Sequence, residues 1–358
     1  MKNSIPVLAV DNIRVGFKRR RRDPMFWALD DVSLAITPGR TMGLVGESGS
    51  GKSTLANAVL GLVPTTSGSI SLLGEDITGL SISARRRLAR SMQAVFQDPS
   101  SSLDPSWSIG RSLAEPMRAQ GERNSADIAA RAAQLLDDVG LDRDAARRYP
   151  RQFSGGQRQR ISIARALMTS PKIVICDESV SALDLSVQAQ ILNLLADLQD
   201  KHRLSYLFIS HNMSVVRHIC HDITVLYRGQ VMETGPTGPV TREPAHPYTR
   251  ALLLAVPVAD PAAQRERRQH SDVPAVVPAA HATGCPFAAR CPVAVDICTA
   301  DRPKLRGIGD GRSVACHRYP EWQKVLESTG PGALERREIG LPDTGPSLGD
   351  STWKDETS

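Results

Sequence analysis

Short apolar runs alternate with stretches of helical periodicity through the first two thirds of the chain. Apolar and polar residues alternate over residues 8–17 and 32–36, which predicts two strands. Residues 41–45 form a short apolar run ending at Gly46, which predicts a third strand. A helix is then expected, because apolar residues recur at helical spacing: Leu55, Val59 and Leu62.

The same alternation continues further along the chain. Residues 173–176 are uninterruptedly apolar, as in a central parallel strand buried on both faces, and residues 206–210 predict a second such strand. Residues 223–226 and 230–233 predict a hairpin. A helix is predicted between the strands 173–176 and 206–210, because apolar residues recur there on one helical face: Val187, Ile191, Leu194 and Leu198. Alternating strands and helices predict an α/β layered domain that covers residues 1–240.

Changes in composition along the chain mark three further regions, the first of them inside the α/β domain. From residue 99 to 150 the composition shifts to Ala, Arg, Leu and Asp with helical periodicity, which predicts an inserted helical subdomain over about residues 98–170. Residues 241–320 form an extension that contains a cysteine cluster. Residues 321–358 are rich in Gly, Pro and charge, and we expect a disordered tail there.

The overall composition excludes some classes of protein. With 41% hydrophobic and 23% charged residues, the 358-residue chain is neither wholly disordered nor fibrous. Its net charge of +6 suits an acidic ligand, an anionic membrane face or nucleic acid without choosing between them. The basic run 18–22 predicts a solvated loop, with contact to lipid as the alternative.

The sequence favours a soluble protein of the cytoplasm, with docking onto a membrane protein compatible with it. No segment approaches the roughly 18 apolar residues that a membrane span needs. The N-terminus has a single lysine and no apolar segment, so it does not resemble a secretory signal. Six cysteines are too few for a disulfide scaffold in a chain of this length.

A glycine-rich segment carries the clearest chemistry. Residues 46–53 match the P-loop pattern G-x-x-x-x-G-K-[ST], between a predicted strand and a predicted helix. Its backbone N–H groups and the helix dipole favour a phosphate. We expect Lys52 to reach the β- and γ-phosphates and Ser53 to hold Mg²⁺; the flanking elements disfavour an incidental glycine-rich turn. The predicted nucleotide contacts are Gly46, Glu47, Ser48, Gly49, Ser50, Gly51, Lys52, Ser53 and Thr54.

Two acidic residues complete this hypothesis. The strand 173–176 leads directly to Asp177 and Glu178 at the sheet edge. We expect Asp177 to bind Mg²⁺ through water and Glu178 to polarise the water that attacks the γ-phosphate. Two solvated acids at a strand end would be the simpler interpretation without a P-loop.

Residues 153–160, Phe-Ser-Gly-Gly-Gln-Arg-Gln-Arg, resemble the signature motif of the ATP-binding-cassette (ABC) ATPases, and the order of motifs is that of the family. The resemblance implies a P-loop NTPase cassette with a RecA-like core, an antiparallel β-subdomain and the inserted helical subdomain. It also implies a head-to-tail dimer with ATP between the subunits. Five residues would then act on the nucleotide of the other subunit: Ser154, Gly155, Gly156, Gln157 and Asp184.

Further family motifs match single residues. Gln97 resembles the Q-loop glutamine, which touches Mg²⁺ and senses the membrane partner. Residues 181–184 resemble the D-loop, and His211 resembles the switch histidine that contacts the γ-phosphate and assists Glu178 and Lys52 in catalysis. Ser179 stands where the family has proline, which removes no catalytic group.

An aromatic residue is also expected to stack on adenine. Phe17 occupies the matching position, in place of the commoner tyrosine. Phe26 and Trp27 are the alternatives.

Three segments resemble the ATPases of oligopeptide/dipeptide importers: residues 96–105, 186–195 and 246–249. The resemblance as a whole extends over residues 8–320. The resemblance implies ATP hydrolysis coupled to solute transport, as in a translocase. It implies a second, different ATPase subunit, two membrane permease subunits and an extracytoplasmic substrate-binding protein, with this chain peripheral on the cytoplasmic face of the inner membrane. No nucleic-acid partner is expected.

Other interpretations are kept beside this one. Nickel and glutathione importers share the architecture, and an accessory subunit of a phosphonate-cleaving complex has similar cassettes. ABC proteins of translation or DNA repair usually carry two cassettes or a large inserted arm, unlike this chain. A purely regulatory nucleotide-binding module would not need to keep Glu178 as a base.

The extension carries Cys285, Cys291, Cys298 and Cys316. Their spacing lacks the C-x₂-C pairs that zinc ribbons favour, and cytoplasmic disulfides are disfavoured. Four thiolates from a proline-rich loop can ligate an iron–sulfur cluster. The resemblance supports this, since some peptide-importer ATPases carry a four-iron four-sulfur cluster; zinc and free thiols are the alternatives. Two other cysteines, Cys176 and Cys220, are expected to be buried as small apolar residues.

Overall fold

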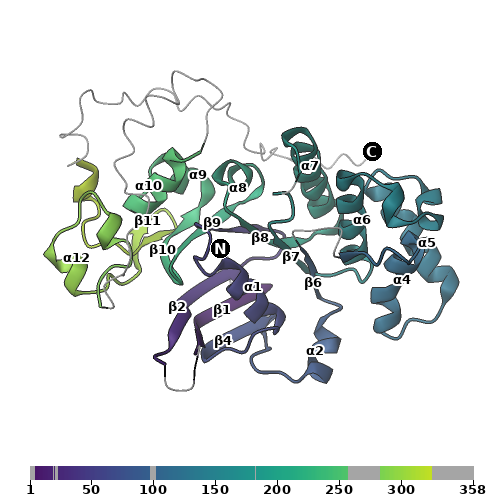
Figure 1. Cartoon of the computed structure of the whole chain (residues 1–358), viewed down its shortest axis with the longest axis horizontal. Helices are drawn as coiled ribbons and strands as arrows, with labels where there is room; N and C mark the ends of the chain where they lie inside the picture. Colours follow the sequence, from purple (N-terminus) through teal and green to yellow (C-terminus); the bar gives the residue numbers. More distant parts are fainter. Residues whose placement is uncertain are drawn as a thin grey trace, which may run out of the picture.

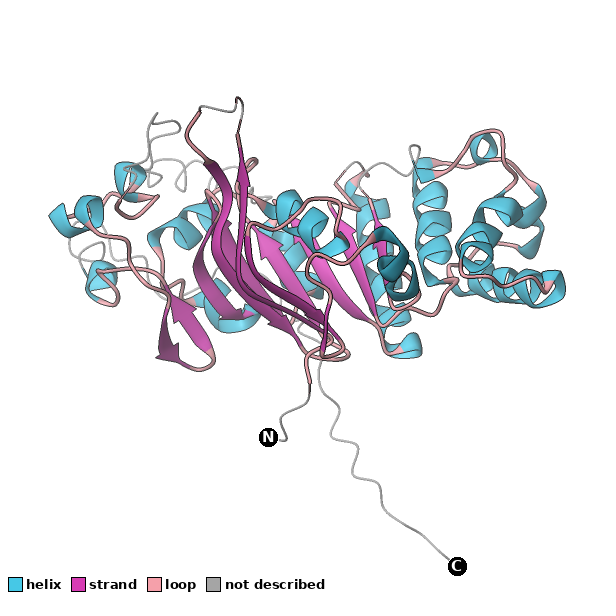
Figure 2. Ribbon diagram, turned by 90° about the horizontal axis from the view of Figure 1, so that it is seen from below, coloured by secondary structure: helices cyan, strands magenta, loops and turns pink. Residues whose placement is uncertain are grey.

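The computed structural model describes residues 5–18, 20, 23–96, 102–181, 183–256 and 283–324. Two β-sheets and their covering helices make up these ranges (Figure 1, Figure 2). The predicted linker after Pro257 and most of the predicted tail lie outside them, as do Gln97 and most of the basic run. Within the described ranges, none of the helices is long and apolar enough to cross a membrane.

The smaller sheet has four strands in the order β2-β1-β4-β5. The sequence predicts β1 (Leu8–Phe17) with its observed bounds, and β2 (Phe26–Ile36) begins six residues before the predicted 32–36. A break in register lies between Val10 and Ile13, where Asn12 has a φ of 49°. This bulge keeps both residues buried although their spacing departs from simple alternation. The other strands are β4 (Ser67–Leu72) and β5 (Glu75–Asp76).

The larger sheet has eight strands in the order β11-β12-β10-β9-β3-β8-β7-β6. Its centre is parallel, and every residue of β3 (Thr41–Val45) and β8 (Ser205–Ser210) is buried. This explains their continuous apolar character. The neighbouring strands are β6 (Met92–Val95), β7 (Ile173–Asp177), β9 (Asp222–Tyr227) and β10 (Gln230–Pro236), the last two forming the predicted hairpin.

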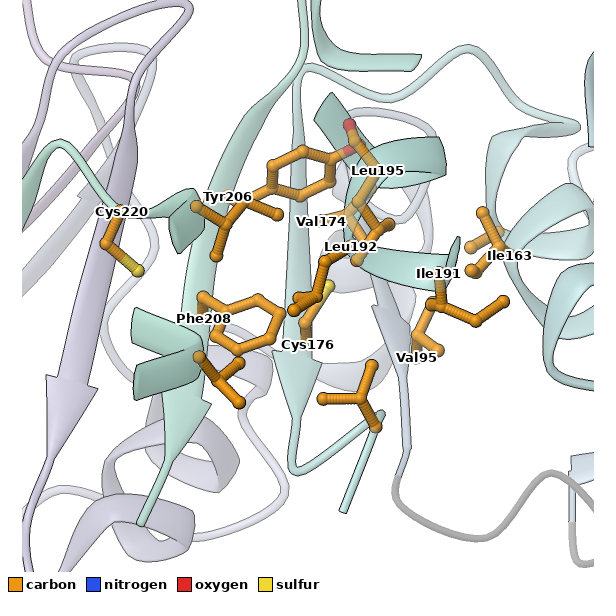
Figure 3. Close-up of a cluster of buried hydrophobic side chains, with 14 of the residues drawn as sticks. Val95, Ile163, Val174, Cys176, Ile191, Leu192, Leu195, Tyr206, Phe208 and Cys220 are labelled. Atoms are coloured by element: carbon orange, nitrogen blue, oxygen red, sulfur yellow. The ribbon is translucent and has the colours of Figure 1, made fainter. Parts of the chain in front are cut away.

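Two hydrophobic clusters lie on opposite faces of this sheet. Along β7, Val174 and Cys176 belong to one cluster, whereas Ile173 and Ile175 belong to the other. Figure 3 shows the first cluster, where Phe208 lies near Cys176. Cys176 and Cys220 are buried, which confirms the expectation for these two residues.

Helices cover the sheet and form the predicted helical region. In that region α4, α5 and α6 pack against one another beyond β6 and β7 (Figure 1). The longer helices are α1 (Lys52–Leu60), α4 (Ile109–Ala119), α5 (Ser125–Asp138), α6 (Gly155–Leu167), α7 (Leu185–His202) and α10 (Pro247–Leu254). The shorter ones are α2 (Ile82–Leu88), α8 (Met213–Ile219), α9 (Thr237–Arg242) and α12 (Asp296–Ala300), with 3₁₀ turns η1 (Arg143–Arg147), η2 (Pro150–Gln152) and η3 (Ala288–Arg290).

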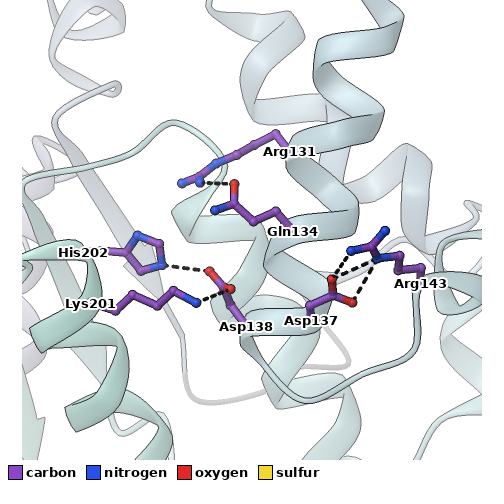
Figure 4. Close-up of polar contacts among 7 residues, drawn as sticks. All are labelled: Arg131, Gln134, Asp137, Asp138, Arg143, Lys201 and His202. Carbon is purple, nitrogen blue, oxygen red and sulfur yellow. Dashed lines mark hydrogen bonds and ion pairs between the residues drawn. The ribbon is translucent and has the colours of Figure 1, made fainter.

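A buried carboxylate ties α5 to α7. Asp138 at the end of α5 is 4% exposed, and it accepts hydrogen bonds from Lys201 Nζ at 2.8 Å and His202 Nε2 at 2.9 Å (Figure 4). Both partners lie in the last turn of α7. Burial alone would raise the pKa of Asp138, but the hydrogen bonds and charges of Lys201 and His202 together outweigh burial and lower it.

The cysteine-bearing segment continues the larger sheet. Strands β11 (Arg306–Gly309) and β12 (Arg312–Val314) form a hairpin, and β12 pairs with β10. Trp322 Nε1 donates to the carbonyl of Ala245 at 2.8 Å. We call residues 283–324 the cysteine module. Its packing brings it close to the carboxyl end of β3, where the P-loop begins.

Candidate nucleotide-binding site

The P-loop connects β3 to α1 through three glycines with left-handed backbones. The φ angles are 156° at Gly46, 76° at Gly49 and 106° at Gly51. A Cβ on Gly46 would lie 2.1 Å from the carbonyl oxygen of Leu226, and one on Gly51 would lie 2.6 Å from that of Ala28. Glycine is therefore required by both conformation and space at these two positions.

Lys52 fills the inside of this curve. Its side chain is 5% exposed, and Nζ donates to the carbonyls of Gly46 and Glu47 at 2.8 Å each. Burial lowers the pKa of Lys52, while Glu178, Asp177 and Glu47 oppose the shift. The loop thus presents a buried cation on its concave side, which is the charge that a phosphate requires.

The remaining P-loop residues differ in exposure. Ser48 and Gly49 are exposed at the tip of the loop, whereas Ser50 is buried. Ser53 is exposed and Thr54 half-buried in the first turn of α1. The segment is anchored by the N–H of Gly229, which donates to the carbonyl of Ser50 at 2.8 Å.

Asp177 lies beside the P-loop at the carboxyl end of β7. Ser53 Oγ donates to Asp177 Oδ1 at 3.5 Å. Burial raises the pKa of Asp177; Ser53 opposes the shift, Glu178 adds to it, and Lys52 opposes it. A hydroxyl and a carboxylate side by side are suitable oxygen ligands for Mg²⁺, which usually keeps several waters and takes few protein ligands. In the described ranges, no group of three or more His, Cys, Asp or Glu side chains is arranged to hold a metal.

Glu178 and His211 meet at the same edge. Glu178 follows β7 with a φ of 45°, and its N–H donates to the carbonyl of Ile209 at 3.1 Å. Its Oε1 lies 3.2 Å from His211 Nδ1. The two side chains come together because β7 and β8 are adjacent parallel strands. The His211 side chain is 55% exposed, so the imidazole ring is open to a ligand.

The signature segment begins a helix elsewhere in the chain. Ser154 caps α6: its Oγ accepts from the N–H of Gln157 at 3.3 Å, and the Gln157 side chain accepts from the N–H of Ser154 at 3.0 Å. A Cβ on Gly156 would lie 2.5 Å from Val187 Cγ1, so α6 approaches α7 closely there. Asp184 in turn caps α7.

Two of the aromatic side chains that are candidates for stacking on adenine are exposed. Phe17 and Phe26 are cross-strand partners on β1 and β2, and they are 44% and 66% exposed. The guanidinium of Arg14 lies 5.1 Å from the Trp27 ring centroid, so Trp27 already has a stacking partner. Both phenylalanines are thus open to a planar ligand.

The four clustered cysteines line one small cavity. Its volume is about 20 Å³, which is roughly the room for one water. His246 and Phe287 also contribute to its wall. Burial raises the pKa of Cys285 to about 11 and of Cys291 to about 12. The donor types suit an iron–sulfur cluster, but the side chains are not arranged around a metal.

Two residues beyond the cassette motifs reach the P-loop and were missed from the sequence. Tyr248 Oη accepts from the N–H of Glu47 at 2.9 Å, and Arg290 forms an ion pair with the Glu47 carboxylate at 2.7 Å. Tyr248 lies in the segment 246–249, which resembles peptide-importer ATPases. That resemblance gave no indication of the contact.

Comparison with known proteins identifies the family of the chain. Residues 29–181 match the ABC transporter family, and residues 232–298 match the family described as oligopeptide/dipeptide transporter, C-terminal region. A Brucella abortus protein named "Putative peptide import ATP-binding protein BAB2_1053" is 50% identical over 293 residues, 82% of this chain and 86% of that protein. A Brucella ovis protein named "Putative peptide import ATP-binding protein BOV_A0347" is 45% identical over 314 residues, 87% and 98% of the two chains.

Solved structures share the fold. The cbiO1 protein of Clostridium perfringens, described as part of the ABC transporter complex cbiONQ, is 25% identical with a TM-score of 0.60, over 66% of this chain and 91% of that chain. The cassette MJ0796, solved as a dimer with ADP and Pi, is 27% identical with a TM-score of 0.58, over 64% and 98%. Fold and site define a P-loop ATPase cassette. The chain belongs to the ABC transporter ATP-binding proteins, with an oligopeptide/dipeptide transporter C-terminal region.

Proposed function

We propose that this chain binds and hydrolyses ATP to drive a translocase that imports oligopeptides, dipeptides or similar small solutes. The observation that carries the proposal is the convergence of Lys52, Asp177 and Glu178 at one sheet edge, with His211 within 3.2 Å of Glu178. The names of the relatives and the C-terminal family match support peptides as the cargo class.

Each residue has a separate role in this mechanism. The N–H groups of the P-loop and the Lys52 ammonium neutralise the phosphates, and Phe17 stacks on adenine. Glu178 accepts a proton from the attacking water, and His211 orients Glu178 and contacts the γ-phosphate. Ser53, Asp177 and Gln97 would hold Mg²⁺, which supplies positive charge toward the transferring phosphoryl group.

The proposal includes a second subunit. Ser154, Gly155, Gly156 and Gln157 of one ATPase contact the nucleotide bound by the other, and Asp184 packs across the dimer. The helix N-terminus that Ser154 caps is a suitable phosphate site. The second ATPase is a different chain, and both bind two membrane permease subunits on the cytoplasmic face of the membrane, which receive cargo from a substrate-binding protein.

Substitution of the proposed base tests hydrolysis. Glu178→Gln keeps the shape of the side chain but removes its basicity, so we expect ATP binding to persist and turnover to fall at least about 10²-fold. Glu75→Gln, a change at an exposed glutamate on β5, is the matched control and retains turnover. Normal turnover in Glu178→Gln would remove Glu178 from the role of base.

Membrane partners test the transport proposal. We expect the chain to co-purify with two permease subunits and a second ATPase when the neighbouring genes are expressed together. Recovery with a phosphonate-processing complex instead would support the accessory-subunit alternative.

We also propose that Cys285, Cys291, Cys298 and Cys316 ligate a four-iron four-sulfur cluster with a structural role. Their support is that the four side chains carry the thiol donors such a cluster requires and line the same cavity, which must widen from its volume of about 20 Å³ to hold it. Anaerobically purified protein is expected to contain four iron and four sulfide per chain, by the stoichiometry of such a cluster. Cys291→Ser should lower this content. Zinc without sulfide, or four titratable thiols without iron, would contradict the proposal.

A further inference from the structure

The cysteine module contacts the P-loop through one arginine. Arg290 Nη1 lies 2.7 Å from Glu47 Oε2, and Nη2 lies 3.0 Å from Glu47 Oε1. This is a bidentate pair, the strong geometry for guanidinium and carboxylate. The two residues are 243 positions apart in the sequence.

The guanidinium is held in place on other sides as well. The Arg290 side chain is 13% exposed, and its charge centre lies 5.8 Å from the Tyr227 ring centroid and 5.6 Å from that of Phe287. Nη1 also lies 3.5 Å from Tyr227 Oη. These contacts already restrict the rotamers of Arg290, so it loses little conformational entropy on pairing with Glu47. The pair is therefore better organised than a typical surface ion pair.

The carboxylate belongs to a residue whose backbone shapes the P-loop. The N–H of Glu47 donates to Tyr248 Oη at 2.9 Å, and its carbonyl accepts from Lys52 Nζ at 2.8 Å. The N–H of Ser50 donates to the same carbonyl at 3.2 Å. Fixing the side chain of Glu47 therefore restrains the first bend of the loop that would surround a phosphate.

The position of Arg290 is set within the cysteine module. It ends the turn η3, whose backbone hydrogen bonds connect Ala288 to Cys285 and Cys291 to Ala288. Phe287, directly before this turn, packs edge-on against Tyr227 with ring centroids 5.4 Å apart. A change in the module would thus move the guanidinium relative to Glu47.

We propose that Arg290 is a positioning residue for nucleotide binding: through Glu47, the cysteine module holds the P-loop in its phosphate-binding curve. The inference rests on the proposed nucleotide site at residues 46–53. Arg290 acts through Glu47 and does not itself need to touch the nucleotide.

Binding measurements on single and double variants test this inference. The probe is ADP carrying a fluorescent N-methylanthraniloyl group, titrated with Mg²⁺ into the purified full chain. Arg290→Ala should raise the Kd for this ADP analogue about tenfold, because it removes one charge-assisted contact. Arg290→Lys should have an intermediate Kd because it cannot make the bidentate pair. The KM for ATP should rise in both variants while kcat changes by less than about twofold.

A double-mutant cycle separates coupling from general destabilisation. Glu47→Ala should weaken binding, and Glu47→Ala with Arg290→Ala should be no weaker than the poorer single variant. Arg306→Ala is the matched control, since Arg306 lies in the same module and its described side-chain hydrogen bond is to the Tyr319 carbonyl rather than to the P-loop. We expect it to bind as wild type does.

The outcomes distinguish this inference from the proposed function. If wild type binds the probe and Arg290→Ala binds it equally well, or if the two single effects simply add, the positioning role is wrong. A wild-type chain that binds no nucleotide overturns the proposed function and this inference with it. Should Arg290→Ala fail to fold by circular dichroism, Arg290→Lys and Glu47→Gln give the same comparison.

Discussion

Replacing one P-loop glycine tests the geometry of the loop most sharply. In Gly46→Ala the new Cβ would lie 2.1 Å from the Leu226 carbonyl oxygen and 2.7 Å from Ser50 Oγ, at a φ of 156°. The backbone conformation alone costs about 1–3 kcal/mol for a residue other than glycine. The contact with a backbone oxygen cannot be relieved by side-chain rotation, so we expect a total loss of about 3 kcal/mol or more.

The matched control is Gly79→Ala. Gly79 also has a left-handed φ, 62°, but a Cβ there would meet nothing within 4 Å. We expect it to lose only about 1–2 kcal/mol and to keep nucleotide affinity. Urea unfolding and titration with the fluorescent ADP analogue measure both quantities. If Gly46→Ala is as stable as Gly79→Ala and binds nucleotide as wild type does, the close approach at Gly46 does not exist in solution.

Three further changes test the described packing. Asp138→Asn should lower the free energy of unfolding at pH 7 by about 1–3 kcal/mol, measured in urea. Because the folded pKa of Asp138 is lowered, the wild-type advantage is present above the unfolded pKa and should disappear as pH falls below about 4, through the folded pKa. Phe208→Ala should cost about 3–5 kcal/mol in the same assay, since Phe208 is fully buried. Trp322→Phe should lose about 1 kcal/mol with its hydrogen bond to Ala245, and an unchanged unfolding midpoint would argue against docking of the module.

The parts of the site that sequence predicts are those encoded in contiguous residues. The P-loop is one such segment, since strand, glycines and Lys52 follow one another and fold locally. The contact between Glu178 and His211 was harder to predict from the sequence, because it depends on β7 and β8 being neighbours in the sheet. The order of family motifs indicated both residues but not their 3.2 Å separation.

Two kinds of feature were not predicted from the sequence: a long-range contact, and strands that lack a strand-like pattern. The Arg290–Glu47 pair joins two elements through the folding of the whole chain, and neither residue has a distinctive local pattern. The first half of β2 was missed because its apolar residues, Phe26, Trp27, Ala28 and Leu29, follow one another without polar residues between them, so they show no alternation. Strands β11 and β12 were missed because short segments rich in Gly and Arg lack strand periodicity.

The central claim is that ATP binds between the P-loop of one subunit and the signature helix of another. A cryo-EM structure of the transporter with Glu178→Gln and trapped ATP tests it directly. We predict that the triphosphate bound by this chain lies against Lys52, with the N-terminus of the second ATPase's signature helix facing its γ-phosphate. At the nucleotide bound by the second ATPase, Ser154 of this chain takes the corresponding position. A triphosphate bound away from residues 46–53, or Ser154 facing solvent in the closed dimer, would contradict it.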